Sequence, residues 1–148
     1  MRLTLHSDYA LRTLMYVALA PERLVSIAEI AERYGISRNH LMRVVQELAQ
    51  KGFVVTQQGR GGGMRLAAQA DAIRIGAVVR EMEPDFALVE CFQPQGNCRL
   101  SPDCQLGGVL DEALAAFFAV LDRYTLADLI APANALRARL GLDAAVPR

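Results

Sequence analysis

Tryptophan, histidine and cysteine are absent or scarce in this 148-residue sequence, and long apolar runs are missing as well. There is no tryptophan, there are only two histidines, and no cysteine lies outside residues 91–104. No apolar run approaches the roughly 18 residues that a bilayer-spanning helix needs. The N-terminal stretch carries charged residues and has no small-residue cleavage site, unlike a signal peptide. We therefore expect a cytoplasmic protein without membrane contact, where disulfides are disfavoured.

Catalytic motifs are also lacking. The sequence contains no HExxH pattern, no nucleophile elbow and no paired acid–base signature. Its glycine-rich stretch, residues 59–63, is not followed by the lysine and hydroxyl residue of a phosphate-binding loop. These absences argue against an enzyme.

Charge is balanced overall but unevenly distributed. The formal net charge is zero, yet residues 1–65 hold nine Arg/Lys against five Asp/Glu, and residues 66–148 hold seven against eleven. A neutral protein can still attract nucleic acid through one basic face, although such segregation also occurs on ordinary polar surfaces. The first half of the chain is therefore the better candidate for a DNA contact.

The segment SIAEIAERYGISRNHLMRVVQELAQKGF has the pattern of two short helices joined by a tight glycine turn. Ser26 and Glu29 form a capping-box pattern at the start of the first helix, and Gly35 is placed to end it. Ser37 is the predicted N-cap of the second helix. The inward positions of that helix are apolar at helical spacing: Leu41, Val44, Val45 and Leu48. An αα-hairpin would share this spacing, but the turn is typical of helix-turn-helix proteins.

The start of the second helix is rich in hydrogen-bond donors, which favours DNA binding over a plain helical hairpin. In the major groove an arginine can pair with guanine and an asparagine with adenine, and a helix N-terminus favours phosphate. We predict DNA contacts from this turn and from the cap of the preceding helix: Ser26, Ser37, Arg38, Asn39, His40 and Arg43.

A β-hairpin is predicted next in the chain. Apolar and β-branched residues 53–57 precede the glycine turn 59–63, and a return strand follows. A hairpin directly after a recognition helix fits a wing that lies along the DNA backbone. There Arg60, Gly61 and Arg65 would meet phosphate or the minor groove. A mobile hairpin without a DNA contact is the alternative.

The second half of the sequence predicts a short helix, or an entry from a strand into a helix, over residues 73–83, then a loop with prolines and glycine, and a long helix. A heptad seam follows the long helix: Leu106, Leu110, Ala113, Phe117, Val120 and Tyr124. A second apolar stripe beside it indicates that this helix packs on its own domain and also on a partner helix, unless it is wholly buried. The predicted fold is mainly α with a small β-hairpin wing. We expect four parts: a winged helix-turn-helix domain (1–83), an irregular loop (84–105), a dimerisation helix (106–130) and a loosely ordered tail (131–148).

All three cysteines fall in the loop, with the spacing C-x6-C-x5-C. Zinc sites prefer shorter C-x2-C or C-x4-C pairs, and an odd number of cysteines argues against a disulfide framework. Thiolates this far apart suit an iron–sulfur cluster, with zinc or another metal, or unrelated thiols, as alternatives. No histidine follows Cys104, so a fourth ligand must come from elsewhere. The candidates are His6, Asp8 and His40, although Asp8 could equally be a helix cap or the partner of Arg12.

Several segments together resemble one known family. They are SDYALRTLMYVA, ISRNHLMRVVQELAQKGFV, GRGGGMRL, IRIGAVVREMEP, the three cysteines and YTLADL, which cover residues 2 to about 130. SRNHLMRVVQEL and the cysteine loop followed by YTLADL are the specific parts. The chain resembles the winged-helix superfamily of cluster-dependent transcriptional regulators, and within it the nitric-oxide-sensing repressors.

The resemblance implies a homodimer with long crossing helices and a cluster near the dimer interface. Cys91, Cys98 and Cys104 match the family's cluster cysteines, and Asp8 matches a carboxylate that reaches the cluster from the partner chain. Relatives that regulate cluster supply use a histidine shortly after the third cysteine. Here Gly107 and Gly108 occupy that region, which favours the nitric-oxide branch. The first gap of six residues is one longer than is familiar.

From the resemblance we expect a repressor that binds a double-stranded DNA operator as a homodimer and responds to nitric oxide through its cluster. A 4Fe–4S cluster is favoured and a 2Fe–2S cluster is the alternative. Asp8 and Arg12 are the expected switch residues. The competing functions are a regulator of the same fold that senses iron or cluster supply, and a small iron–sulfur electron carrier.

Overall fold

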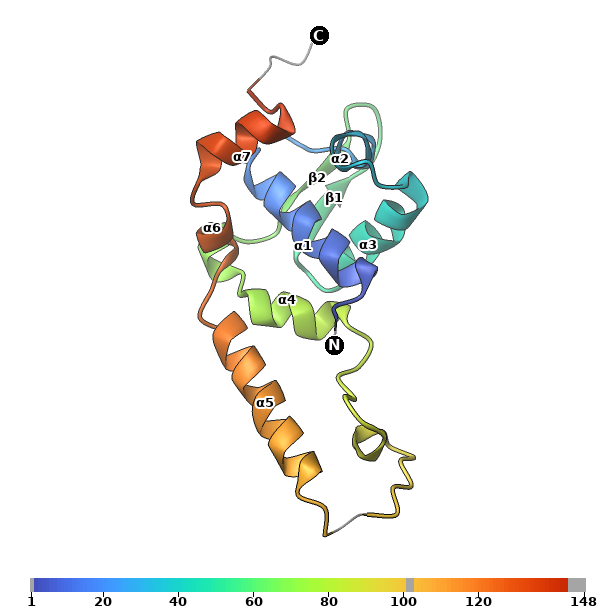
Figure 1. The fold of residues 1–148 in the computed structure, drawn as a ribbon. Helices are drawn as coiled ribbons and strands as arrows, with labels where there is room; N and C mark the ends of the chain where they lie inside the picture. The colour runs from blue at the N-terminus through green and yellow to red at the C-terminus, as the bar shows by residue number, and fades with distance from the viewer. Residues whose placement is uncertain (1, 101–102, 144–148) are drawn as a thin grey trace.

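The computed structural model describes residues 2–100 and 103–143 of the chain (Figure 1). Helices dominate this part, with one antiparallel pair of strands. The elements in chain order are α1 (Leu5–Ala18), α2 (Ile27–Tyr34), α3 (Arg38–Gln50), β1 (Val54–Gln57), β2 (Gly63–Leu66), η1 (Ala70–Ala72), α4 (Ile75–Met82), η2 (Glu90–Phe92), α5 (Leu106–Leu121), α6 (Leu126–Leu129) and α7 (Ala133–Leu140). The prediction of a mainly α fold with a small hairpin is confirmed. None of the described helices is long and apolar enough to cross a membrane.

Helix α1 is the centre of the winged-helix part. Ala10 and Leu14 pack in one apolar cluster with residues of α3 and α4, and Tyr16 and Val17 pack in a second cluster with α2 and β2. Because α1 is covered on two sides, apolar residues recur on both of these sides, and the Asp8–Arg12 pair lies on the part of the helix that faces solvent. Full burial of a side chain of the size of Leu14 or Val17 stabilises the fold by about 1.5–3 kcal/mol.

The turn between α2 and α3 forms as the sequence predicts, but the predicted capping box is open. The Ser26 hydroxyl accepts a hydrogen bond from the Glu29 backbone N–H at 3.2 Å. The Glu29 carboxylate does not accept a hydrogen bond from the Ser26 backbone N–H, which a complete capping box requires. Instead it accepts from the Tyr16 hydroxyl at 2.8 Å and from the Arg23 guanidinium. Gly35 ends α2 in the left-handed conformation, with φ at 64°.

The wing is a hairpin with a third, short partner. Strands β1 and β2 pair in register from Val54 with Leu66 to Gln57 with Gly63. On the other edge of β2, Met64 and Val25 exchange backbone hydrogen bonds of 2.8 and 2.9 Å. A Cβ atom at Gly63 would lie 2.7 Å from the Val25 carbonyl oxygen, so this close approach requires glycine. The base of the wing is therefore fixed to the helical core.

The chain leaves the winged-helix part after α4 through the cysteine loop, and α5 runs back beside this loop toward α4 (Figure 1). The helix predicted over residues 106–130 is wrong in its extent, because α5 ends at Leu121 and α6 starts after Thr125. Thr125 and Asp128 form a capping box for α6, and the Leu126 side chain is fully buried in the core. These contacts end α5 and anchor the following segment on the winged-helix core.

The C-terminal segment is more ordered than predicted. Residues 133–140 form α7, and the Arg137 guanidinium donates a 2.6 Å hydrogen bond to the Leu19 carbonyl at the end of α1. Leu140 and Leu142 pack against the second apolar cluster. The prediction of a loose tail is therefore wrong for residues 133–143, and its remainder, residues 144–148, lies outside the described residues.

An ion pair joins α4 to the end of α5. Both terminal nitrogens of Arg80 donate to the two Asp122 carboxylate oxygens at 2.7 Å, and the guanidinium also lies 4.1 Å from the centre of the Phe118 ring. Hydrogen bonding from Arg80 lowers the pKa of Asp122. A Cβ atom at Gly76 would lie 1.9 Å from Asp122 Oδ1. Gly76 thus leaves the space in which the carboxylate sits.

Candidate DNA-binding surface and metal centre

Helix α3 presents a polar face to solvent. Its apolar positions Leu41, Val44, Val45 and Leu48 are buried, as the spacing predicts. The opposite face carries the predicted reading residues in exposed positions: Ser37, Arg38, Asn39, His40 and Arg43. Ser37 precedes α3 but makes no capping hydrogen bond with its side chain. Ser26 is half-buried and its hydroxyl is engaged with Glu29, so it is less accessible than the rest.

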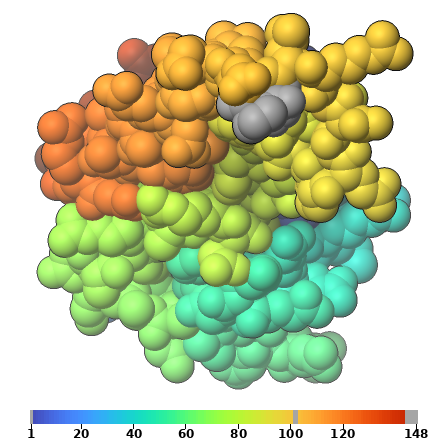
Figure 2. Space-filling view, turned by 90° about the horizontal axis from the view of Figure 1, so that it is seen from below, coloured from blue at the N-terminus to red at the C-terminus, as the bar shows by residue number. Residues whose placement is uncertain are grey.

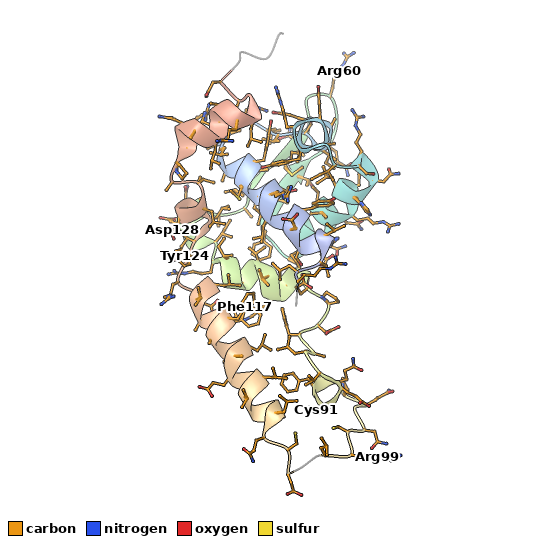
Figure 3. The ribbon with its side chains drawn as sticks, in the orientation of Figure 1. Arg60, Cys91, Arg99, Phe117, Tyr124 and Asp128 are labelled. Atoms are coloured by element: carbon orange, nitrogen blue, oxygen red, sulfur yellow. The ribbon has the colours of Figure 1, made fainter. Side chains whose placement is uncertain are left out.

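The wing tip places further cations on the surface. Arg60, Gly61 and Arg65 are all exposed, and Figure 3 shows Arg60 at the end of the hairpin, far from Cys91. Gly59 and Gly61 adopt positive φ angles of 100° and 77°, which side-chain-bearing residues rarely adopt. The glycines therefore shape the tip that carries Arg60, whereas Arg65 extends from β2, opposite Val55.

The sequence reasoning missed three residues of the same α3 face. Met42, Gln46 and Gln50 are exposed between and beyond the predicted contacts. They line a shallow groove together with Asn39 and Arg43. Met42 lies three residues after Asn39 and Gln46 three residues after Arg43, and this helical spacing was the signal that could have identified them.

The first turn of α1 holds two of the predicted ligand candidates in different contacts. His6 Nε2 lies 2.8 Å from Glu47 Oε2 and so connects α1 to the recognition helix. Asp8 pairs with Arg12 one turn later, at 2.8 Å between Oδ2 and Nη2. The alternative use of Asp8 as the N-terminal cap is wrong, because Thr4 caps the helix by accepting the Ser7 N–H.

A second contact connects α1 to the start of the cysteine loop. The Thr4 backbone N–H and hydroxyl both donate to Glu83 Oε1, at 2.7 and 3.0 Å. Glu83 directly follows α4 and precedes the loop predicted over 84–105. The N-terminus of α1 is therefore tethered to the loop within one chain. The sequence gives no signal for this pairing, because the residues are far apart in the chain.

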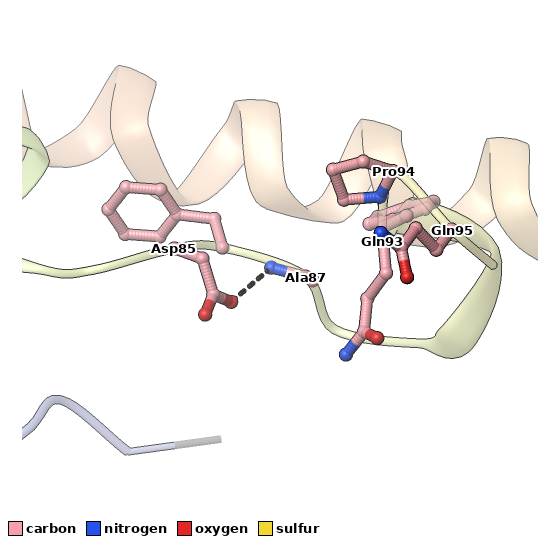
Figure 4. A pocket seen from close by; sticks show the side chains of 7 residues that line it. Asp85, Ala87, Gln93, Pro94 and Gln95 are labelled. Atoms are coloured by element: carbon pink, nitrogen blue, oxygen red, sulfur yellow. Dashed lines mark hydrogen bonds between the residues drawn. The ribbon is translucent and has the colours of Figure 1, made fainter.

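The cysteine loop lies beside α5 (Figures 1 and 2), and Figure 1 shows it at the far end of the molecule from the wing. Cys91 is exposed, Cys98 and Cys104 are half-buried, and all three are free thiols. Cys91 lies close to α5, since a Cβ atom at Gly107 would be 3.8 Å from its sulfur. The early loop is shaped by a hydrogen bond from the Ala87 N–H to Asp85 Oδ1 at 2.9 Å, beside a pocket that Figure 4 shows.

The donor chemistry of this loop fits an iron–sulfur cluster, for which cysteine thiolates are the protein ligands. Within residues 2–100 and 103–143, however, no three His, Cys, Asp or Glu side chains converge on one point. His6 and Asp8 lie on α1 in the ion pairs described above, and His40 lies on α3 near the Tyr9 ring. The described part of one protomer thus holds the thiols but does not bring them together with a further ligand.

One side of α5 is apolar and uncovered. No residue of α5 is buried, and the exposed fractions of Leu106, Val109 and Val120 are 57%, 61% and 44%. Tyr124, which follows the helix, is 48% exposed. The other side of α5 packs on its own protomer through Phe118 and Leu121. Leu106, Val120 and Tyr124 of the predicted heptad seam are thus exposed, whereas Leu110 and Phe117 of the same seam are half-buried and Val109 lies outside it.

A helix-turn-helix with an exposed, donor-rich recognition helix and a wing defines a winged-helix DNA-binding regulator. The family model Rrf2, described as an iron-dependent transcriptional regulator, matches residues 3–132, and the chain belongs to this family.

Curated relatives are similar over nearly the whole chain. The HTH-type transcriptional regulator NsrR of Bacillus subtilis (strain 168) is 52% identical over 132 residues, which cover 88% of this chain and 90% of that protein. NsrR of Shouchella clausii (strain KSM-K16) is 48% identical over 142 residues, covering 95% of both. These are the proteins to which the sequence resemblance points, and the resemblance is confirmed. Since the relatives are transcriptional regulators, the chain is a regulator and not an enzyme, as expected.

Solved structures confirm the fold. CymR (YrzC), described as the global cysteine regulator of B. subtilis, has a TM-score of 0.73 at 26% identity and covers 88% of this chain and 97% of its own. IscR of T. potens has a TM-score of 0.70 at 25% identity, with 90% and 88% covered. The electron-carrier alternative gains no support from either group of relatives.

Proposed function

We propose that this protein is a nitric-oxide-responsive transcriptional repressor that binds operator DNA as a homodimer and senses through an iron–sulfur cluster. The observation that carries the proposal is the cysteine loop: it holds three free thiols, it lies beside a helix whose apolar side is uncovered, and the chain belongs to a family of iron-dependent regulators. The operator lies on cytoplasmic DNA, where thiols remain reduced.

Operator binding uses the exposed face of α3. Arg38, Asn39, His40 and Arg43 enter the major groove, where arginine and asparagine distinguish base pairs by bidentate hydrogen bonds. Arg60 and Arg65 contact the phosphate backbone beside the groove, together with the exposed backbone of Gly61. The hydroxyls of Ser26 and Ser37 stand at the N-terminal ends of α2 and α3, where phosphate is favoured.

Dimerisation covers the apolar face of α5. The exposed side chains of Leu106, Val109 and Val120 pack against the same residues of a second copy. Apolar surface of this extent is normally covered in a soluble protein. Two copies then present two α3 helices to paired half-sites, as is usual for dimeric helix-turn-helix proteins.

Cys91, Cys98 and Cys104 hold the cluster, and Asp8 of the partner subunit supplies the remaining ligand. A 4Fe–4S cluster is favoured over a 2Fe–2S cluster. When bound, the cluster supplies iron with which nitric oxide reacts. Within the chain, Asp8 already has a partner in Arg12, so ligation competes with this ion pair. A carboxylate that has an alternative partner one turn away is a ligand that is easily released.

The contacts of α1 give the signal a path to DNA. A change in the loop acts through Glu83 on Thr4, which caps α1, and release of Asp8 acts on the same first turn. His6 then connects this turn to Glu47 on the recognition helix. A small rotation of α1 therefore alters the placement of α3. Allosteric couplings of this kind are typically worth about 1–3 kcal/mol, or about 5- to 150-fold in affinity.

The test is operator binding by oxygen-free protein during titration with nitric oxide, compared with treatment by an iron chelator. We expect loss of binding within the first few equivalents of nitric oxide. A regulator of iron or cluster supply is the second candidate, because the family is described as iron-dependent. If operator binding is lost with the chelator but unchanged by nitric oxide, the protein is a regulator of iron or cluster supply and our proposal is wrong.

A further inference from the structure

One apolar side chain stands in the middle of the polar face of α3. Met42 is 57% exposed, whereas the apolar residues Leu41 and Val44 of the same helix are fully buried or nearly so. Its neighbours on the surface are amides and cations, among them Asn39, Arg43 and Gln46. Met42 therefore contributes little to the core, and its exposure to water is unfavourable in the free protein.

The surroundings of Met42 suit DNA better than protein. Met42 lies in a shallow groove between α2, α3 and β1, which also receives Ile27 and Thr56. The lining contains amides, apolar groups and the Arg43 guanidinium, and no carboxylate. A groove without acidic groups and with a cation beside it is compatible with the edge of a base pair flanked by phosphates.

We infer that Met42 reads thymine in each half-site, by packing against the 5-methyl group in the major groove. This inference rests on the proposed insertion of α3 into that groove. The thymine methyl is the apolar group in the major-groove pattern, so it is the feature an apolar side chain can recognise. The rise from Asn39 to Met42 is about 4.5 Å along a helix, close to the roughly 3.4 Å between base pairs. The thymine should therefore lie next to a base pair that Asn39 contacts.

The experiment begins with selection of an operator from a random duplex library by the wild-type homodimer in oxygen-free buffer. Each thymine of the selected half-site is then replaced by deoxyuridine, which removes only the methyl group. We expect one position per half-site at which the replacement lowers affinity about fourfold, the value for one buried methyl group. The other thymines should be insensitive.

The variant Met42→Ala decides which side chain detects that methyl group. It should bind the thymine operator more weakly than wild type and bind the thymine and deoxyuridine operators equally. Met42→Leu, which keeps an apolar side chain, should retain most of the discrimination. The comparison also controls for any effect of deoxyuridine on duplex shape, since such an effect would persist in Met42→Ala.

Two results would overturn the inference while leaving the proposed function intact. One is a selected operator to which deoxyuridine makes no difference, and the other is an equal deoxyuridine effect in wild type and Met42→Ala. A library from which the holo protein selects no sequence would instead contradict operator recognition itself, and the inference would fall with it.

Discussion

At the scale of single residues, one half-buried carboxylate connects three elements of the winged-helix core. Glu29 of α2 accepts from Arg23 before the helix and from Tyr16 of α1. Hydrogen bonding from Arg23 lowers the pKa of Glu29, while burial raises the pKa of Tyr16 to about 12. The ionised form of Glu29 is therefore favoured by folding.

This carboxylate predicts an acid sensitivity. A group whose pKa is lower in the folded state contributes stability above its unfolded pKa of about 4.3, and the contribution is lost as pH falls through the folded value. Glu29→Gln should therefore be less stable than wild type at pH 7, with the difference shrinking below about pH 4. Urea unfolding at several pH values measures it. A difference independent of pH would contradict the assignment.

A second prediction concerns Asp8. In Asp8→Ala the three cysteines remain, so we expect the visible absorption of a bound cluster together with an altered operator response to nitric oxide. Absorption spectra and gel-shift titrations on oxygen-free protein measure the two properties. Asp71→Ala, an exposed carboxylate of η1, is the matched control. If Asp8→Ala behaves like the parent in both assays, Asp8 serves only its ion pair with Arg12.

At the scale of elements, the helices and turns that depend on local sequence patterns could be predicted. The elements whose ends depend on contacts between distant residues could not. The α2–α3 turn follows from Gly35 and the buried spacing of α3, and the wing from its glycines. The heptad seam continues in sequence to Tyr124, yet the Tyr124 carbonyl accepts the Ile75 N–H at 3.0 Å and the helix has already ended. The Thr125–Asp128 capping pattern was the available signal for this break.

The candidate site shows the same limit. The exposure of the predicted residues of α3 follows from periodicity, because the buried positions identify the opposite face. The contacts of Thr4 with Glu83 and of His6 with Glu47 join residues distant in sequence, and no local pattern encodes them. The relation of the cysteine loop to α1 therefore required the structure.

The junction between α4 and α5 gives a prediction at this scale. Replacing glycine by alanine inside a helix normally stabilises by about 0.5–1 kcal/mol. Gly76→Ala should gain less, because its Cβ atom displaces the Asp122 carboxylate from Arg80. In an Asp122→Ala background the space is free and the full gain should appear. Urea unfolding of the four variants measures the coupling, and an identical effect of Gly76→Ala in both backgrounds would refute it.

At the scale of the whole molecule, the wing and the cysteine loop lie at opposite ends of the protomer, and the proposed dimer would add a second connection between them. Figure 3 shows Arg60 of the wing and Cys91 of the loop far apart in one protomer. Helix α5 extends between its junction with α4 and the cysteine loop, with its apolar side uncovered. A second copy on this side would fix the separation of the two α3 helices and bring a partner's α1 toward the loop.

The dimer can be tested through an α5 residue that is exposed in the protomer. Val109→Lys places a charge on the exposed apolar side of α5, where Val109 is 61% exposed. We expect a folded monomer by sedimentation and circular dichroism, with operator binding strongly weakened because two half-sites are no longer read together. Ala115→Lys, exposed away from the seam, should remain dimeric. A Val109→Lys protein that stays dimeric would place the interface elsewhere.

The central claim is that thiolates of the cysteine loop hold a cluster that sets operator affinity. The most direct test compares oxygen-free wild-type protein with the Cys98→Ser variant. For each protein, the iron and sulfide content, the visible spectrum and the operator affinity are measured. We predict a coloured wild type that binds tightly, and a Cys98→Ser variant with less iron and sulfide whose operator affinity is lower by tenfold or more, about 1.4 kcal/mol. The claim would be contradicted by a wild-type protein that is colourless and yet binds its operator tightly.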